Sequence, residues 1–173
     1  MNRWLRDHTS PLIVAHRGAN TQAPENTLAA FRQALILGAD AIECDIHLTR
    51  DRVPVVMHDP VANRTSDGRG RIGRKTLTQI KELDVGKRFD KKFTGERVPT
   101  LEELFQEFGR QTLYLIELKN FLNPYNGLDR VVAELIARYK LEDYVLVQSF
   151  SPLPPRLVKK RIPRVPIVLL YFP

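Results

Sequence analysis

Six short apolar runs, most of them separated by segments of helical periodicity, set the pattern of this chain. The runs cover residues 12–15, 40–46, 53–57, 112–118, 144–148 and 165–171. Because they are almost continuously apolar, they predict buried strands. Apolar positions at helical spacing predict helices over 27–37, 100–108 and 129–139, and short helices near 77–83 and 156–161. Strands alternating with helices indicate an α/β fold with a parallel sheet, either doubly wound or a TIM (β/α)8 barrel.

Local signals mark several boundaries between these elements. Asn26 precedes the first helix as a candidate N-cap, and Gly38 marks its C-terminal end. Thr100, with glutamates two and three positions later, is a typical helix start. Residues 61–98 are rich in Gly, Arg and Lys, so this stretch predicts a small insertion or long loop. We expect it to lie within a single domain over 1–173.

The composition is that of a globular protein rather than a membrane or disulfide-rich one. Hydrophobic residues make up 43% of the chain, enough for a core. No apolar run approaches the roughly 20 residues of a membrane span, and residues 1–11 lack the apolar centre of a secretory signal. The single cysteine, Cys44, excludes an internal disulfide and fits a reducing cytosol. We therefore expect a cytoplasmic protein without stable membrane insertion.

The chain is basic, with a net charge of +7 from 27 basic and 20 acidic side chains. Such an excess favours partners that carry phosphate. It gathers at 87–92 and at 159–164. Neither cluster forms a long basic recognition helix, so we interpret both as solvated faces and expect no nucleic-acid partner.

Chemically active side chains stand where the predicted strands end. In chain order they are His16 and Arg17, Glu43 and Asp45, His58 and Asp59, Glu117 and Lys119, and Gln148 and Ser149. In a parallel α/β fold the carboxyl ends of the strands share one rim, and in a barrel that rim holds the active site. The pattern therefore predicts a single site built from five successive strands.

The acidic residues indicate a cation site. Glu43 and Asp45 are two positions apart on a strand, so both point to the same face. Neighbouring carboxylates on a buried strand are costly unless a cation or a proton compensates them. With Glu117 they offer hard oxygen ligands suited to Mg²⁺ or Ca²⁺, whereas the spacings typical of zinc are missing. Each acid could instead form a surface ion pair, but its place within an apolar strand favours the site.

His16 and His58 each end an apolar strand beside these acids. A histidine in that position is often structural, but two of them favour general acid–base catalysis. His8, in the N-terminal tail, and His47, past the acids on its strand, have weaker claims. Asp59 either orients His58 or caps the loop that follows.

These groups together describe attack on a phosphodiester. A cation and the forked guanidinium of Arg17 would offset charge on the phosphoryl oxygens. One histidine would activate the nucleophile, and the other would protonate the leaving alkoxide.

Four blocks of the chain resemble the signature of the glycerophosphodiester phosphodiesterases of the cytosolic bacterial type. They are AHRGANTQAPENTLAAF, GADAIECDIHLTRDRVPVVMHDP, RVPTLEEL and LYLIELK, in the family's order and spacing over about residues 12–150. Their combination is far more specific than any single block. The resemblance implies a TIM barrel with a small insertion after the third strand, here at about 61–98.

The resemblance also implies a reaction and a role for each residue. The reaction is metal-dependent hydrolysis of glycerophosphodiesters, such as glycerophosphocholine or glycerophosphoethanolamine, to sn-glycerol 3-phosphate and an alcohol. At matching positions His16 and His58 are the acid/base pair, Glu43, Asp45 and Glu117 hold a divalent metal, Arg17 and Lys119 bind the phosphate, and Glu25 is a supporting acid near the metal. The metal is Mg²⁺ or Ca²⁺, with Mn²⁺ as a third candidate. Either the glycerol hydroxyl of the substrate or water makes the first attack.

Length departs from the family pattern. A TIM barrel takes about 250 residues, and the 173 residues of this chain supply about six of its eight strands. We therefore expect a partial barrel, truncated at the C-terminus, whose open edges favour self-association. Two other functions stay open: a lysophospholipase D or sphingomyelinase D type phosphodiesterase on the same fold, and an inactive remnant that only binds metal or phosphodiester.

Overall fold

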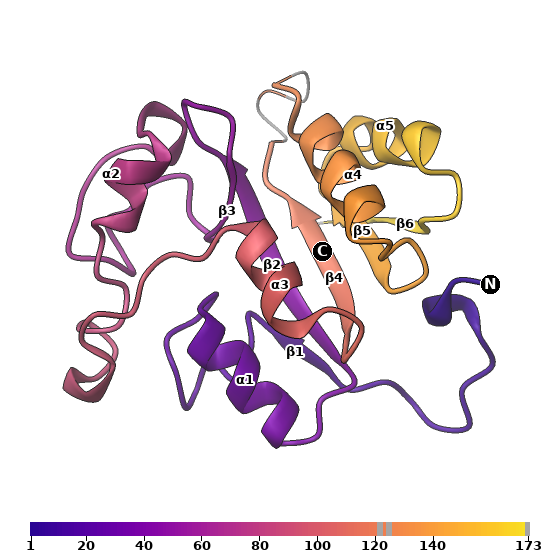
Figure 1. Ribbon diagram of the computed structural model, residues 1–173, viewed down its shortest axis with the longest axis horizontal. Coiled ribbons are helices and arrows are strands. Elements are labelled where there is room, and N and C mark those ends of the chain that lie inside the picture. Colours follow the sequence, from indigo (N-terminus) through magenta and orange to yellow (C-terminus); the bar gives the residue numbers. More distant parts are fainter. Residues whose placement is uncertain (121–122, 124–125, 172–173) are drawn as a thin grey trace.

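A single six-stranded sheet forms the centre of the molecule (Figure 1). The computed structural model describes residues 1–120, 123 and 126–171. The strands are β1 Val14–His16, β2 Ala41–Leu48, β3 Pro54–Val56, β4 Leu113–Leu118, β5 Val145–Ser149 and β6 Ile167–Leu169. Neighbours along the order β1-β2-β4-β5-β6 are parallel. The six predicted strands are confirmed, and their bounds agree within about two residues.

Helices cover the sheet, with α1, α3 and α4 in front of the strands in Figure 1. They are α1 Leu28–Ile36, α2 Leu77–Lys81, α3 Leu101–Phe108, α4 Leu128–Arg138 and α5 Leu153–Arg161, with 3-10 turns η1 Arg3–Leu5, η2 Ile72–Arg74 and η3 Lys91–Phe93. Helix α5 begins three residues earlier than predicted, because prolines are tolerated in a first helical turn. Among the described residues, no helix has the length and apolar character needed to cross a membrane.

Strand β3 runs antiparallel to β2, so the prediction that it is a further parallel strand is wrong. Leu48 pairs with Pro54. The five residues between them are too few for a parallel crossover, which takes about a dozen or more. The chain turns back along β2 instead, and the Met57 amide donates to the Asp45 carbonyl oxygen at 2.9 Å. His58 therefore reaches the acids on the returning arm of a hairpin.

Alternation along β2 separates the core from the site. Ile42, Cys44 and Ile46 are fully buried in a cluster with residues of α1, α3 and α4. Because successive side chains of a strand alternate between faces, Glu43 and Asp45 point to the opposite side of the sheet. Burial of the apolar face fixes the register, since a slip of one residue would move these acids into the core.

Residues 61–98, called the insertion below, are packed rather than loose. Their apolar side chains join the hairpin in a second cluster of Val55, Met57, Ala62, Ile72, Ile80, Leu83, Val85 and Val98. Val55 and Met57 belong to the arm that carries His58. The insertion therefore fixes the position of that histidine.

The start of α1 differs from the prediction. Thr27, not Asn26, is the N-cap, and its hydroxyl oxygen accepts from the Ala30 amide at 3.1 Å. Asn26 adopts a left-handed φ of 58°, and its side-chain amide donates to Asp45 at 2.8 Å. Gly38 ends the helix as predicted, with a φ of 86° that a glycine adopts without strain.

The outer strands β1 and β6 each pair on one side only in the described part of the chain. Ile13, directly before β1, is 62% exposed, and Val168, within β6, is 42% exposed. Open edges with exposed apolar side chains favour association between chains, and self-association stays a prediction.

Asp84 holds the insertion's far loop closed, and we expect its loss to destabilise the fold. One carboxylate oxygen accepts from the amides of Gly86 and Lys87, both at 2.9 Å, and the other accepts from Gly95 at 2.8 Å. In Asp84→Asn an NH₂ group replaces one acceptor, leaving a backbone donor unpaired at a cost of about 1–3 kcal/mol. Thermal melting at neutral pH measures this loss, with the exposed Asp7→Asn as the charge-matched control.

The effect of Asp84→Asn also depends on pH. Hydrogen bonds from Lys87, Gly95 and Gly86 lower the pKa of Asp84 below its usual 3.8. An acid with a lowered folded pKa stabilises the fold above its unfolded pKa and loses that contribution as the pH falls through the folded pKa. The gap in melting temperature should therefore be full at pH 7 and shrink in acid below about pH 4. A gap that stays constant into acid would contradict the role of the carboxylate charge.

Candidate active site

Three carboxylates converge on the inner face of the sheet. Glu43 and Asp45 come from β2, and Glu117 lies beside Asp45 on β4 in the strand register. One oxygen of each lies within 4.8 Å of the others. The exposed fractions are 3%, 0% and 7% respectively. The strands therefore bring together the three acids that the sequence analysis singled out.

The cluster is short of positive charge. Lys119 lies 3.1 Å from Asp45 and 2.7 Å from Glu117, and Arg17 lies 3.4 Å from Asp45. Burial first, and Asp45 second, raise the pKa of Glu43 to about 8. Burial also raises the pKa of Glu117. Three buried acids facing two cations are the environment that a further cation relieves.

The donor set fits a divalent cation. All three candidate ligands are carboxylates, the hard donors that Mg²⁺, Ca²⁺ and Mn²⁺ prefer. Asp45 Oδ1 is fully buried and accepts no hydrogen bond in the described part of the chain, although the Lys119 ammonium lies 3.1 Å away. A buried carboxylate oxygen without a hydrogen bond is an available ligand.

Arg17 is held in place by its backbone as well as its side chain. Its φ is 59°, a costly value for a residue with a side chain. Its amide donates to the Glu43 carboxylate at 3.0 Å, and its guanidinium donates to Glu25 at 3.2 Å. A Cβ on the next residue, Gly18, would lie 2.7 Å from the Ala30 backbone. The first strand therefore ends in a tight turn that aims the guanidinium at the acids.

His16 and His58 come from two different segments, the end of β1 and the returning arm of the hairpin. His16 ends β1, next to Glu43 in the register. Partial burial, followed by Arg17, lowers the pKa of His16 below its usual 6.5. His58 Nδ1 lies 2.8 Å from the Asp59 carboxylate. Asp59 therefore orients His58, which decides between the two roles left open by the sequence.

Arg64, which the sequence analysis did not single out, links two of these groups. Its guanidinium donates to both Glu25 oxygens at 2.7 and 2.8 Å, and to both Asp59 oxygens at 2.7 and 3.1 Å. It lies in the insertion, away from any strand end, so no periodicity signals it. Asn26 was predicted only as a helix cap and not as a site residue, although it follows Glu25 within the block AHRGANTQAPENTLAAF.

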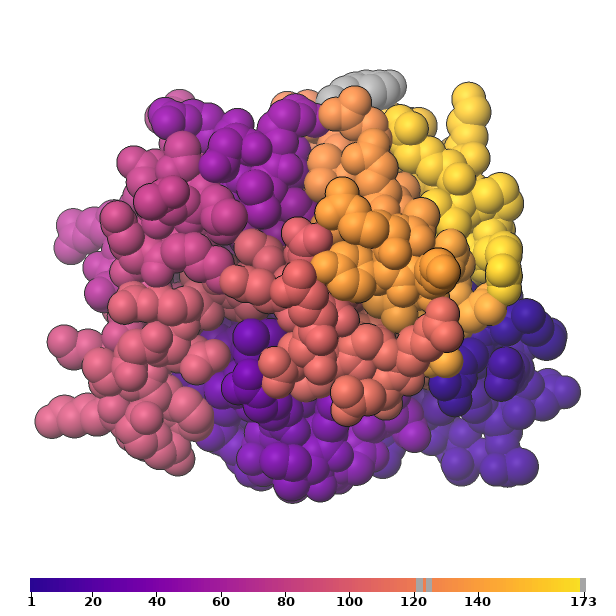
Figure 2. Space-filling view, in the orientation of Figure 1, coloured from indigo at the N-terminus to yellow at the C-terminus, as the bar shows by residue number. Residues whose placement is uncertain are grey.

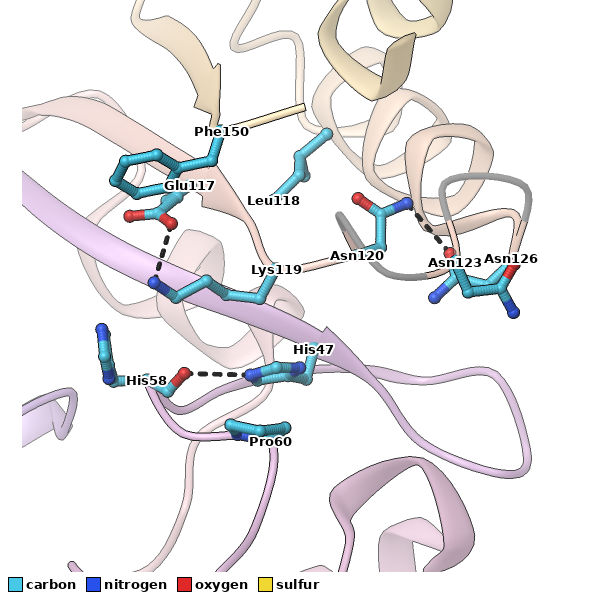
Figure 3. A pocket seen from close by; sticks show the side chains of 10 residues that line it. All are labelled: His47, His58, Pro60, Glu117, Leu118, Lys119, Asn120, Asn123, Asn126 and Phe150. Atoms are coloured by element: carbon cyan, nitrogen blue, oxygen red, sulfur yellow. Dashed lines mark hydrogen bonds and ion pairs between the residues drawn. The ribbon is translucent and has the colours of Figure 1, made fainter. Parts of the chain in front are cut away.

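A cavity of about 470 Å³ opens beside the acids (Figure 3). It is lined by His47, His58, Pro60, Glu117, Leu118, Lys119, Asn120, Asn123, Asn126 and Phe150. Lys119 points toward Glu117 at one end, and the asparagines stand at the other (Figure 3). His47 lines the cavity, and its Nε2 lies 3.0 Å from the His58 carbonyl oxygen. This nitrogen is engaged by the backbone, so His47 shapes the cavity rather than joining the acid cluster. His8 is exposed and contacts the Arg3 carbonyl oxygen, away from these groups.

Comparison with known proteins identifies the family. A model of the "Glycerophosphoryl diester phosphodiesterase family" matches residues 16–172. The chain belongs to this family. It is 44% identical over 161 residues to a glycerophosphodiester phosphodiesterase of Caldanaerobacter subterraneus subsp. tengcongensis, covering 92% of this chain and 66% of that relative. The chain thus spans about two thirds of the length of the curated relatives it matches.

Solved structures of family members share its fold. A glycerophosphodiester phosphodiesterase from Agrobacterium tumefaciens superposes with a TM-score of 0.82 at 34% identity, over 91% of this chain and 66% of that one. An Oleispira antarctica phosphodiesterase, solved in complex with the product sn-glycerol-3-phosphate, gives 0.84 at 31% identity, over 92% and 65%. These neighbours are TIM barrels, so the parallel α/β sheet here forms part of such a barrel, as predicted.

Proposed function

We propose that this chain is a metal-dependent phosphodiesterase that hydrolyses glycerophosphodiesters to sn-glycerol 3-phosphate and an alcohol. The observation that carries the proposal is the buried triad of Glu43, Asp45 and Glu117, whose ligand oxygens lie within 4.8 Å of one another. Arg17 and Lys119 form ion pairs with these acids, and His16 and His58 are close enough to interact with them electrostatically. Relatives that bear this name, and a structural neighbour solved with sn-glycerol-3-phosphate, support the choice of substrate.

The triad would hold Mg²⁺, Ca²⁺ or Mn²⁺. A divalent ion there supplies charge stabilisation for the phosphoryl oxygens of the substrate. Arg17 and Lys119 bind the same phosphate, Arg17 with its fork and Lys119 as a point charge. Glu25 fixes the direction of Arg17 through their ion pair of 3.2 Å.

The two histidines divide the proton transfers. The lowered pKa of His16 keeps its imidazole neutral at pH 7, which suits a general base that accepts the proton of the attacking hydroxyl. The Asp59 carboxylate, 2.8 Å from His58 Nδ1, orients the ring so that its other nitrogen can donate a proton to the leaving alkoxide. The attacking hydroxyl belongs either to the glycerol of the substrate or to water.

The experiment is release of sn-glycerol 3-phosphate from glycerophosphocholine. We expect turnover that stops with EDTA and returns with one of Mg²⁺, Ca²⁺ or Mn²⁺.

Lysophosphatidylcholine, assayed in parallel, tests the lysophospholipase D alternative. Metal binding by calorimetry without turnover of either substrate would show a binding protein instead. The single buried Cys44 supports a location in the reducing cytoplasm.

Arg64 should act as a positioning residue. It braces Asp59, which orients His58, and Glu25, which orients Arg17. Partners of this indirect kind typically contribute about 10- to 100-fold, so Arg64→Met should lower kcat by that factor. The limb of the pH–rate profile that reports the catalytic acid should also shift, because Asp59 becomes free to turn from His58.

A matched control for Arg64→Met is Arg69→Met, an exposed arginine of the same insertion. It should leave both kcat and the pH profile unchanged. If Arg64→Met lowers only the melting temperature, with kcat and pH profile intact, Arg64 serves stability and not the orientation of His58.

A further inference from the structure

The positive charge of the chain is concentrated in the insertion. Residues 61–98 hold 11 of the 27 basic side chains and five of the 20 acidic ones, so they carry +6 of the net charge of +7. The rest of the molecule is almost neutral. Arg17 and Lys119 lie outside the insertion, and Arg64 is one of its eleven basic residues, so the candidate active site accounts for little of this excess.

The far loop of the insertion, residues 85–96 and called the basic loop below, is closed by contacts between its two arms. Its ends are joined by the Val85 amide, which donates to the Glu96 carbonyl oxygen at 3.0 Å. A Cβ on Gly86 would lie 1.9 Å from the Phe93 carbonyl oxygen, so the two arms of the loop touch there. A closed loop of this kind presents its side chains without further loss of conformational entropy.

The basic loop displays cations around an aromatic pair. The exposed basic residues are Lys87, Arg88, Lys91 and Lys92. Phe89 is 42% exposed, and its ring packs edge-on against Phe93 with centroids 5.7 Å apart. Figure 1 shows this segment on the side of the molecule away from α4 and α5, and in Figure 2 its side chains project at the lower left.

We propose that the basic loop is a docking surface for an anionic lipid bilayer. Lysine and arginine side chains are attracted to the anionic lipids of a membrane surface, and an exposed Phe between them inserts at the headgroup level. A nucleic acid is a less suitable partner for this surface. Bases stack on open faces of aromatic rings, and one face of the Phe93 ring is covered by the Lys92 ammonium, 5.1 Å from the ring centroid.

The docking surface adjoins the candidate active site. The Arg88 guanidinium donates to the carbonyl oxygens of Asn63 and Arg64. Arg64 in turn contacts Glu25 and Asp59. A membrane bound at the basic loop therefore lies beside the rim that holds the acids, although the proposal does not depend on the reaction catalysed there.

The test is co-sedimentation of the 173-residue chain with vesicles. We expect binding to phosphatidylcholine mixed with phosphatidylglycerol, no binding to phosphatidylcholine alone, and loss of binding at high salt. Each basic side chain near an anionic surface strengthens binding roughly fivefold. The triple variant K87Q/K91Q/K92Q should therefore weaken binding on the order of 100-fold.

The matched control removes three exposed charges elsewhere, as K140Q/R156Q/K160Q. It should bind within about twofold of the unaltered chain, because these side chains lie outside the proposed surface. Equal losses in both triple variants would show a general charge effect and overturn the proposal. So would binding to RNA at concentrations that leave the anionic vesicles unbound.

Insertion of the ring is tested separately. Phe89→Trp adds a fluorescent reporter to a chain whose single tryptophan is Trp4. We expect a blue shift with anionic vesicles and quenching by brominated acyl chains, at an unchanged melting temperature. If the added indole keeps the emission wavelength of a hydrated indole while the vesicles are bound, the proposed insertion is overturned.

Discussion

We expect His16→Ala and His58→Ala each to lower kcat for glycerophosphocholine by about 10²–10⁴-fold at neutral pH, the usual contribution of a positioned acid or base. The reason is geometric. His16 ends β1 beside the acids, and His58 is turned by Asp59 so that its other ring nitrogen is available. Release of sn-glycerol 3-phosphate at saturating substrate measures the loss, and circular dichroism verifies the fold.

The two variants should differ in their pH profiles. Because the pKa of His16 lies below 6.5, an enzyme that uses it as the base keeps its activity down to that lower pKa and loses it as the ring becomes protonated. In His16→Ala this acidic limb should disappear, while it should persist in His58→Ala. His8→Ala is the control, since His8 is exposed and away from the acids. Full activity in either active-site variant would remove that histidine from the mechanism.

The sequence was sufficient to predict the acid cluster. Glu43 and Asp45 alternate with apolar residues on a buried strand, and β4 places Glu117 beside Asp45 in register. Both features follow from the two-residue period of strands and from the shared rim of parallel ones. The prediction needed no knowledge of how distant segments contact each other, because the sheet brings its strands together in chain order, apart from β3.

Features that depend on contacts outside the sheet were not predictable in the same way. Strand β3 is antiparallel because only five residues separate it from β2. The length of this connection indicates an antiparallel pair, whereas the apolar pattern of the strand does not distinguish the two directions. Arg64 lies in the insertion, and only the folding of that segment onto the hairpin brings it to Glu25 and Asp59. Asn26 was interpreted by its place before a helix, whereas its side chain bonds Asp45.

Glu43→Gln should stabilise the metal-free protein and abolish its response to metal. Glu43 is the one member of the triad for which no ion pair is found among the described residues, and burial with Asp45 raises its pKa to about 8. Because this pKa lies above 7, Glu43 has to take up a proton when the metal-free chain folds at neutral pH. A neutral glutamine avoids that cost, and its amide oxygen can still accept from the Arg17 backbone. We expect a gain of about 1 kcal/mol without metal, which is about 2–4 °C in Tm for a domain of this size.

The response to metal should change in the opposite direction. A divalent ion at about 100 times its Kd stabilises a folded protein by about 2.7 kcal/mol, or roughly 5–10 °C here. Glu43→Gln should lose that increment together with turnover, since it removes one of three ligands. The control is Glu142→Gln, a change of the same charge on the loop before β5, which should retain both.

Differential scanning calorimetry with EDTA and then with excess Mg²⁺, Ca²⁺ or Mn²⁺ separates the two effects. If Glu43→Gln melts at a lower temperature than the unaltered protein in EDTA, then Glu43 stabilises the fold. In that case the chain's own groups already balance the charge of the three acids without a metal ion. If it melts higher but keeps the metal increment, the ion binds elsewhere. One result supports the cation site: Glu43→Gln has a higher Tm than the unaltered protein in EDTA and gains no stability when metal is added. It would mean that the three acids destabilise the metal-free fold and are held together to bind a cation.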